Sequence, residues 1–325
     1  MPEPIARALW LRPPGEAFIA EESVSEPAGG ELLVRSLYSA VSRGTETLVY
    51  SGQVPASEYE RMRAPFQAGD LPGAVKHGYA NVGVVEHGPG DWPGRRVFCL
   101  YPHQTRYRID ADAAIPLPVD VPPERAVLAA NMETAVNALW DAGASVGDRV
   151  TVIGAGVIGG LIAGLAAGLP GVDVELVDID TRKQYLGDAL GARFRLPDQA
   201  TPERDIVIHA SASEAGLATA IDVAGFEATV LEMSWYGARA VTVPLGGAFH
   251  SKRLTLRSSQ VGAVSPGRRP RRDHRSRLAL AVSLLNDPRF DALIEPDVAF
   301  DTLPDVMRRI ADPGDATLCQ RIRYD

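Results

Sequence analysis

Hydrophobic and polar residues alternate in short runs over the first third of the chain. Gly and Pro separate these runs, which lie at residues 31–38, 82–86 and 96–100. A period of two places successive side chains on opposite faces of a strand, so the runs predict strands. Prolines at positions 116, 118, 122 and 123 end the region. We therefore expect a small, irregular β domain over residues 1–125.

The middle of the chain follows another pattern, in which helices alternate with short apolar strands. Residues 124–142 have helical spacing, and later strands are expected at residues 205–209, 228–232 and 254–257. This alternation is typical of an α/β fold with a doubly wound parallel sheet. We assign residues 126–264 to this second domain.

The remaining segment, residues 265–325, contains an amphipathic helix at 277–285 followed by a tail. The tail is too short to form a domain of its own. We expect the segment to return to the first domain.

The strongest local signal is a β-branched run at residues 150–153 that continues into Gly154, Gly156 and Gly159. The spacing Gly-x-Gly-x-x-Gly between a strand and a helix is the fingerprint of a dinucleotide-binding turn. In this interpretation Gly154 permits the tight turn, Gly156 lets a pyrophosphate approach the backbone, and Gly159 lets the helix pack on its strand. The phosphates would lie at the helix N-terminus. The expected contacts are Gly154, Ala155, Gly156, Val157 and Ile158.

A second apolar run, at residues 174–177, ends in Asp178, which lies 24 positions after Gly154. The fingerprint expects a ribose-binding acid near this place. The carboxylate of Asp178 would accept hydrogen bonds from the adenosine ribose and repel a 2′-phosphate. The sequence therefore favours NAD(H) over NADP(H), although Arg182 and Lys183 lie just beyond and could weaken that preference. Ser211 and Ser234, at the ends of later strands, would line the same crevice.

An alternative for this region is a membrane span, because residues 150–172 carry no charge and are about long enough to cross a bilayer. Six glycines disfavour a continuous membrane helix, since each costs about 1 kcal/mol relative to Ala. Three of them, Gly160, Gly164 and Gly168, recur every four residues. They predict a smooth helical stripe suited to close approach to a sheet or to a second subunit.

Composition excludes several other classes of protein. The 325 residues are 46% hydrophobic and 23% charged, with a net charge of -8, which argues against general affinity for nucleic acid or anionic membrane. Cys99 and Cys319 are too few for a disulfide framework or a structural zinc cluster. The first residues show no secretion signal, so we expect a cytoplasmic protein with reduced thiols.

Six arginines gather in residues 267–277. Arginine forks suit phosphate or RNA. No aromatic platform accompanies them, which favours a solvated loop entering a helix. A third interpretation is that some of these arginines close over an anionic substrate or the cofactor pyrophosphate.

The order of these parts resembles the medium-chain dehydrogenase/reductase superfamily over essentially the whole chain. Residues 42–48, 101–104 and 131–135 are similar to the branch that contains the bacteriochlorophyllide dehydrogenases. The resemblance implies a GroES-like irregular β-barrel for the first domain and a Rossmann domain for the second. It also implies an NAD(P)-dependent oxidoreductase, a homodimer formed through an edge of the nucleotide domain, and Thr134 near the nicotinamide phosphate.

The chain departs from zinc-dependent members of this superfamily at each ligand position. Arg43, or Ser42 with a one-residue shift, replaces the cysteine; Tyr79 replaces the histidine of Gly-His-Glu-x-x-Gly; and Ala130 occupies the third position. A catalytic zinc needs about three protein ligands and an open position. We therefore predict no metal and a zinc-independent reaction.

Without zinc, another group must handle the proton during hydride transfer. Tyr79 and Thr45 are the best candidates by position, because Tyr79 replaces the histidine ligand and Thr45 matches the hydroxyl that begins a proton relay in zinc-dependent members. Each is equally suited to an ordinary core hydrogen bond. Glu46 could act as a base, but an ion pair with Arg43 is favoured. His103 could act as a general acid or base, and a structural role is the alternative. Glu133 could reach the cleft or cap its helix.

The sequence thus predicts a zinc-independent NAD(H)-dependent oxidoreductase that interconverts a secondary alcohol and a ketone. One alternative is an enoyl reductase of the same superfamily, which adds hydride to an activated double bond. The other is a non-catalytic NAD(H)-binding sensor or structural subunit. The expected partner is a small-molecule substrate rather than a nucleic acid or a membrane.

Overall fold

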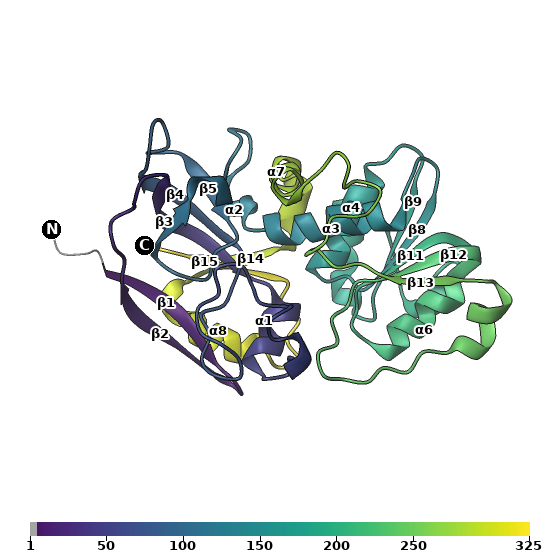
Figure 1. The fold of residues 1–325 in the computed structure, drawn as a ribbon. Coiled ribbons are helices and arrows are strands. Elements are labelled where there is room, and N and C mark those ends of the chain that lie inside the picture. The colour runs from purple at the N-terminus through teal and green to yellow at the C-terminus, as the bar shows by residue number, and fades with distance from the viewer. Residues whose placement is uncertain (1–4) are drawn as a thin grey trace. The chain divides into compact units, whose positions relative to one another are not determined.

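The computed structural model describes residues 5–325, which form two compact units (Figure 1). The first unit contains the chain up to Ala130 together with residues 282–286 and 294–325. The second contains Asn131–Ala281 and Asp287–Leu293. The chain thus passes from the first unit to the second and returns for its last strands.

The first unit contains a mixed seven-stranded sheet and a separate antiparallel hairpin. The hairpin strands are β1 (Ile5–Arg12) and β2 (Glu16–Ser23). The sheet order is β14 (Ile294–Ala299), β15 (Cys319–Arg323), β3 (Glu31–Val41), β4 (Asn81–His87), β5 (Arg96–Cys99), β7 (Ala114–Pro116), with β6 (Arg106–Asp110) also paired to β3. Three helices belong to this unit: α1 (Arg43–Tyr50), α2 (Pro123–Ala126) and α8 (Leu303–Ile310).

The alternating runs of the sequence form β3, β4 and β5, as predicted. Their inward residues, among them Leu32, Val34, Val85 and Val97, pack with Tyr107 into one apolar cluster. The tail supplies β15, which pairs antiparallel with β3, and β14, which pairs parallel with β15. The last strands of the chain therefore complete the sheet begun by the first ones.

The second unit is a six-stranded parallel sheet with helices on its faces, which confirms the predicted fold class. Its order is β10 (Arg193–Arg195), β9 (Asp173–Val177), β8 (Arg149–Ile153), β11 (Arg204–His209), β12 (Ala224–Glu232), β13 (Thr255–Ser258). The helices are α3 (Ala129–Ala142), α4 (Val157–Ala167), α5 (Gln184–Leu190), α6 (Glu214–Val223) and α7 (His274–Leu284). This strand order is 3-2-1-4-5-6, the arrangement that binds dinucleotides where the order reverses. Figure 1 shows α4 and α6 on opposite faces of the sheet.

One helix prediction and one domain assignment differ from the structure. The helix expected over residues 124–142 is broken between α2 and α3, where Val127 and Leu128 turn into the core. Residues 265–281 and 287–293, which we expected to return to the first domain, belong to the second unit. The reason is Arg277, a buried residue of α7 whose guanidinium donates to Glu133 and Asn137 of α3.

The glycine stripe of α4 packs inside the second unit. A Cβ at Gly160 would lie 2.6 Å from Leu293, and one at Gly164 would lie 2.7 Å from Phe290. The stripe therefore receives the short helical turn at Pro288–Leu293 rather than a sheet or a second subunit. Residues 150–172 are divided between β8 and α4, and no helix among residues 5–325 is long and apolar enough to cross a membrane.

Candidate functional site

The glycine-rich turn after β8 has the geometry that the fingerprint predicts. Gly154 has φ +110°, and a Cβ there would lie 2.8 Å from the backbone nitrogen of Ser211. A Cβ at Gly159 would lie 1.8 Å from the carbonyl oxygen of Gly154, so only glycine lets α4 pack on its strand. A Cβ at Gly156 would meet nothing within 4 Å. The backbone at Gly156 is thus open to a ligand.

The N-terminus of α4 faces this open position. Gly156 is its N-cap residue and provides no side-chain acceptor for the first turn, which begins with Val157 and Ile158. Backbone N–H groups at an uncapped helix N-terminus, together with the helix dipole, favour an anion. The turn therefore fits a dinucleotide pyrophosphate.

Asp178 lies immediately after β9 and reaches back to the same turn. Its Oδ2 accepts a hydrogen bond from the Ala155 backbone N–H at 2.7 Å and lies 3.1 Å from the ammonium of Lys183. Its Oδ1 accepts from the Asp180 backbone N–H at 2.9 Å. A carboxylate has about four acceptor sites, so these three donors leave room for a ribose hydroxyl.

The other predicted cofactor residues lie on neighbouring elements of the second unit. Ser211 follows β11, and Ser234 follows β12 and accepts a hydrogen bond from the Ala212 backbone N–H at 3.0 Å. Both serines therefore stand at the carboxyl edge of the parallel sheet, where such folds bind ligands. Thr134 is a partly buried residue of α3.

The structure adds two residues at this edge that the sequence analysis did not assign to the cofactor. His209 ends β11, Glu232 ends β12, and the two are register partners with Nδ1 2.7 Å from Oε2. Each residue is the last of a strand that the sequence predicts. That the two lie side by side could not be predicted, because it depends on β11 and β12 being neighbours in the sheet. A charged residue at the end of each of two predicted parallel strands is the signal that could have found them.

In the first unit, Glu46 and His103 form a buried pair. The side chain of Glu46 is 0% exposed and that of His103 1%, with His103 Nε2 3.0 Å from Glu46 Oε2. The Ser42 backbone N–H donates to Glu46 Oε1 at 2.7 Å. Burial alone would raise the pKa of Glu46, but His103 and the Ser42 N–H hold it below its usual value.

This pairing corrects one expectation, because Glu46 does not form an ion pair with Arg43. The guanidinium of Arg43 instead donates to the carbonyl oxygens of Ile310 and Asp312. On the other side of the imidazole, Ser39 Oγ lies 2.7 Å from His103 Nδ1. Both nitrogens of His103 are therefore engaged inside the unit.

Tyr79 and Thr45 are brought together. The phenol of Tyr79 is hydrogen-bonded to the hydroxyls of Ser42 and Thr45, while burial and the charge of Glu46 raise its pKa to about 12. His77 packs edge-on against Tyr79, with the ring centroids 6.0 Å apart. Burial lowers the pKa of His77 to about 4, so this imidazole is neutral near pH 7. Its Nδ1 is buried without a hydrogen-bond partner.

The three positions that hold zinc in zinc-dependent relatives do not fit the metal. Arg43 is bound to carbonyl oxygens, Tyr79 presents a protonated phenol, and Ala130 presents a methyl group. Zinc sites in proteins are built from thiolate, imidazole and carboxylate donors. Within residues 5–325, no three His, Cys, Asp or Glu side chains are grouped so that they could hold a metal ion.

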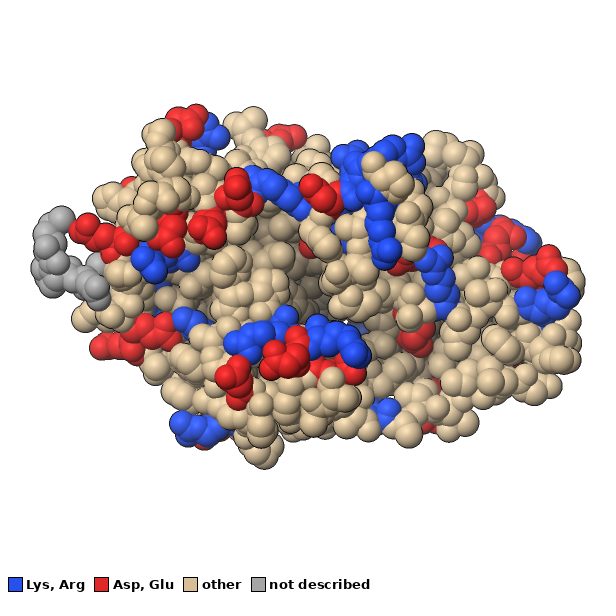
Figure 2. All heavy atoms as spheres, in the orientation of Figure 1, with Lys and Arg blue, Asp and Glu red and all other residues tan. Residues whose placement is uncertain are grey.

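The arginine-rich segment, residues 267–277, leads into the first turn of α7 and is only partly a solvated loop. Arg277 is 1% exposed and forms an ion pair with Glu133 at 3.0 Å. Glu133 is thereby held within the second unit. The other five arginines are exposed: Arg268, Arg269, Arg271, Arg272 and Arg275. Figure 2 shows Lys and Arg side chains gathered over the region that carries α7 in Figure 1.

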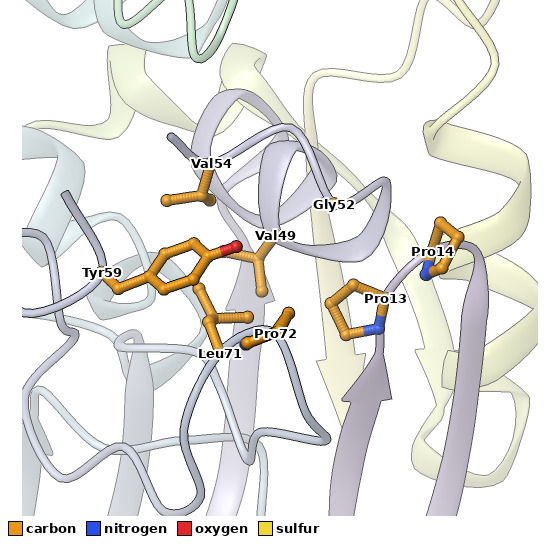
Figure 3. Close-up of a pocket in the computed structure, with 8 residues that line it drawn as sticks. All are labelled: Pro13, Pro14, Val49, Gly52, Val54, Tyr59, Leu71 and Pro72. Carbon is orange, nitrogen blue, oxygen red and sulfur yellow. The ribbon is translucent and has the colours of Figure 1, made fainter. Parts of the chain in front are cut away.

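An apolar cavity of about 180 Å³ lies in the first unit, beside the end of α1 (Figure 3). The side chains of Val49, Tyr59 and Leu71 converge on it, and prolines line its rim. No charged side chain lines this cavity. Tyr59 is the one titratable side chain among its lining residues.

No family model matches the chain. A curated relative, 2-desacetyl-2-hydroxyethyl bacteriochlorophyllide A dehydrogenase of Cereibacter sphaeroides, is 36% identical over 94 residues. This match spans 28% of the chain and about a quarter (26%) of the relative. The chain is thus a distant and partial sequence relative of that protein.

Solved structures match the fold over nearly the whole chain at 16% identity. L-idonate 5-dehydrogenase of Escherichia coli superimposes with a TM-score of 0.81, covering 99% of both chains. A putative zinc-binding dehydrogenase of Sinorhizobium meliloti bound to NADP gives 0.77, covering 99% of this chain and 100% of that one. An E. coli alcohol dehydrogenase complexed with NADH also gives 0.77, covering 98% and 99%. The chain therefore shares the fold of these dehydrogenases over nearly its whole length.

Proposed function

We propose that this protein is an NAD(H)-dependent oxidoreductase that interconverts a secondary alcohol and a ketone without zinc. One observation carries the proposal: an open Gly156 backbone and the Asp178 carboxylate meet at the N-terminus of α4, in a sheet of dinucleotide-binding order. The relatives of this fold bind either NADH or NADP. The choice of cofactor therefore depends on individual residues.

Asp178 favours NAD(H) in this proposal. Its carboxylate is fixed by two backbone N–H groups and would stand where a 2′-phosphate has to be placed. Lys183 lies 3.1 Å away and balances part of this charge. The ammonium group is held by the carboxylate, and it can donate to a ribose hydroxyl beside it.

The proposal that no zinc takes part rests on the hydroxyl groups of Tyr79, Ser42 and Thr45. A bound nicotinamide would supply or accept the hydride. Because its pKa is raised to about 12, the Tyr79 phenol keeps its proton near pH 7 and can donate it to an oxygen that becomes an alkoxide. The Ser42 and Thr45 hydroxyls, which are both partly exposed, can then stabilise the phenolate and relay a proton to it from solvent. Their contact with Tyr79 favours alcohol chemistry over the reduction of a double bond.

His103 and Glu46 have a supporting role in this scheme. Neither reaches the surface: Nε2 of His103 lies 3.0 Å from Glu46 Oε2, and Nδ1 lies 2.7 Å from Ser39 Oγ. The buried negative charge of Glu46 helps to keep Tyr79 protonated. We therefore assign proton donation to Tyr79 and positioning to the buried pair.

Tyr79→Phe tests this assignment. Removing the hydroxyl should lower kcat by roughly 10²-fold or more, as for other general acids, and leave the Kd for NADH unchanged. Tyr59→Phe, in the apolar cavity, is the matched control and should retain full activity. A Tyr79→Phe enzyme with wild-type kcat would assign the proton to another group.

The activity itself is tested by following reduced-nicotinamide absorbance with panels of secondary alcohols, ketones and enones, using protein treated with a chelator. Turnover of alcohols or ketones that survives chelation supports the proposal. Turnover of enones alone would indicate an enoyl reductase. Cofactor binding without turnover on any panel would indicate a sensor or structural subunit, and activity restored only by zinc would contradict the metal-free reaction.

A further inference from the structure

His77 lies beside Tyr79 in the first unit and has a buried polar atom that the fold does not use. The residue is 2% exposed, and its Nδ1 is buried without a hydrogen-bond partner. Within residues 5–325, two other buried side-chain atoms lack a partner, Thr151 Oγ1 and Arg204 Nε, and both lie in the second unit. His77 is therefore the exception in the described part of the first unit.

The other ring nitrogen of His77 is not used by the fold either. Nε2 is not enclosed as Nδ1 is, and no residue among 5–325 is hydrogen-bonded to it. A buried polar group without a partner destabilises the folded state, whereas an apolar side chain of similar size would not. The polarity of this ring gives the described unit no hydrogen bond, which indicates that it serves a ligand.

The neighbours of His77 show which ligand atom this is. Its ring contacts Tyr79 edge-on, with the ring centroids 6.0 Å apart. Tyr79 is hydrogen-bonded to the hydroxyls of Ser42 and Thr45, and it is partly exposed, so a ligand oxygen can reach its phenol. The imidazole thus stands in contact with the proposed proton donor while its own hydrogen-bonding groups remain unused.

The proposed reaction needs more than one hydrogen bond to the substrate oxygen. Hydride transfer to a ketone places negative charge on this oxygen, and preorganised donors aimed at it stabilise the transition state. Burial keeps the His77 imidazole neutral near pH 7, with one N–H. A neutral imidazole can polarise a carbonyl group without giving up its proton.

We propose that His77 donates a hydrogen bond from Nε2 to the reacting oxygen, so that it shares with Tyr79 the negative charge that develops there. The inference rests on the proposed function and adds a second oxygen-binding group to it. During reduction, hydride passes from the reduced nicotinamide to the carbon, Tyr79 gives its proton to the oxygen, and His77 keeps its own. The proton on Nε2 leaves a lone pair on Nδ1, so no N–H is buried without an acceptor.

His77→Leu tests this assignment, because leucine has a similar volume and no donor. It should lower kcat by roughly 10²–10³-fold, the usual loss for one oxyanion donor, and leave KM and the Kd for NADH nearly unchanged. His77→Gln, which keeps an N–H donor, should retain about tenfold more activity than His77→Leu. The assay uses the panel ketone that the wild-type protein reduces with the highest kcat/KM.

The stability of the free protein separates this role from a structural one. Because no hydrogen bond among residues 5–325 involves the imidazole, the urea midpoint of His77→Leu at pH 7 should equal or exceed that of the wild-type protein. His87→Leu is the matched control, since His87 is the exposed last residue of β4 in the same unit, and it should retain wild-type kcat. A lower midpoint together with wild-type kcat in His77→Leu would assign a structural role to the ring and overturn the inference.

A second pair of variants keeps the test independent of folding. If His77→Leu does not fold, His77→Gln and His77→Met make the same comparison between side chains of similar length. His77→Gln should retain about tenfold more activity than His77→Met. Equal activity of these two variants would overturn the inference.

A double variant shows whether both groups act on one oxygen. The loss of kcat in Tyr79→Phe combined with His77→Leu should be smaller than the product of the two single losses, because residues that act as a unit are not additive. A loss equal to that product, or a raised KM with wild-type kcat in His77→Leu, would overturn the inference and leave the proposed function intact. A wild-type protein that turns over no alcohol or ketone would overturn the proposed function and this inference with it.

Discussion

Asp178 is the residue whose substitution we expect to separate the two cofactors. Its carboxylate would make charge-assisted hydrogen bonds to the ribose of NADH, each worth about 1.5–3 kcal/mol, whereas it repels the 2′-phosphate of NADPH. We therefore expect Asp178→Ala to weaken NADH binding by about tenfold or more and NADPH binding far less. Fluorescence titration of both cofactors measures the difference. Asp180→Ala, whose carboxylate contacts Arg182, should change neither affinity, and equal losses in Asp178→Ala would refute this role.

His77 makes stability depend on pH through its lowered pKa. The folded protein holds His77 neutral down to about pH 4, whereas the unfolded chain protonates it near pH 6.5. The unfolded state therefore binds more protons between these values, and the protein loses up to about 3 kcal/mol as pH falls through the window. Unfolding of His77→Gln in denaturant should show a smaller loss between pH 7 and pH 4.5. An identical loss in the variant and the wild-type protein would contradict the burial of a neutral imidazole.

In the segment that joins β8 to α4, two glycines are required for different reasons. Gly159→Ala should destabilise the protein by about 3 kcal/mol or more, because the new methyl group would be forced into the carbonyl oxygen of Gly154. Gly156→Ala should fold with nearly wild-type stability, since its Cβ meets nothing within 4 Å, but it should weaken NADH binding by about tenfold or more by obstructing the pyrophosphate. Denaturant unfolding and NADH titration of this pair of variants compare the two roles. Weakened stability with intact binding in Gly156→Ala would contradict an open phosphate site.

Elements were predictable from the sequence where a periodic pattern determines them. β3, β4 and the β8–α4 turn followed from alternation and from glycine spacing. The hydrogen-bond partners of individual side chains were not predictable, because they depend on which strands become neighbours. Glu46 pairs with His103, 57 positions away, rather than with nearby Arg43, and His209 meets Glu232 because β11 lies beside β12. The break between α2 and α3 likewise reflects core packing that spacing alone does not report.

At the scale of the whole molecule, we propose that the chain dimerises through the edge of its parallel sheet. β13 ends that sheet, all four of its residues are exposed, and an edge strand presents unpaired backbone groups to a second copy. Light scattering at micromolar concentration should give twice the mass of one chain. Leu256→Lys, on this edge, should give monomers that still bind NADH. A monomeric wild-type protein would exclude this interface.

The account as a whole depends on cofactor binding without metal. The most direct measurement is a fluorescence titration of the chelator-treated wild-type protein with NADH and, in parallel, with NADPH. We predict saturable binding of NADH, tighter than that of NADPH, with no change when zinc is added back. Tighter binding of NADPH, or binding of NADH only after zinc is restored, would contradict the account.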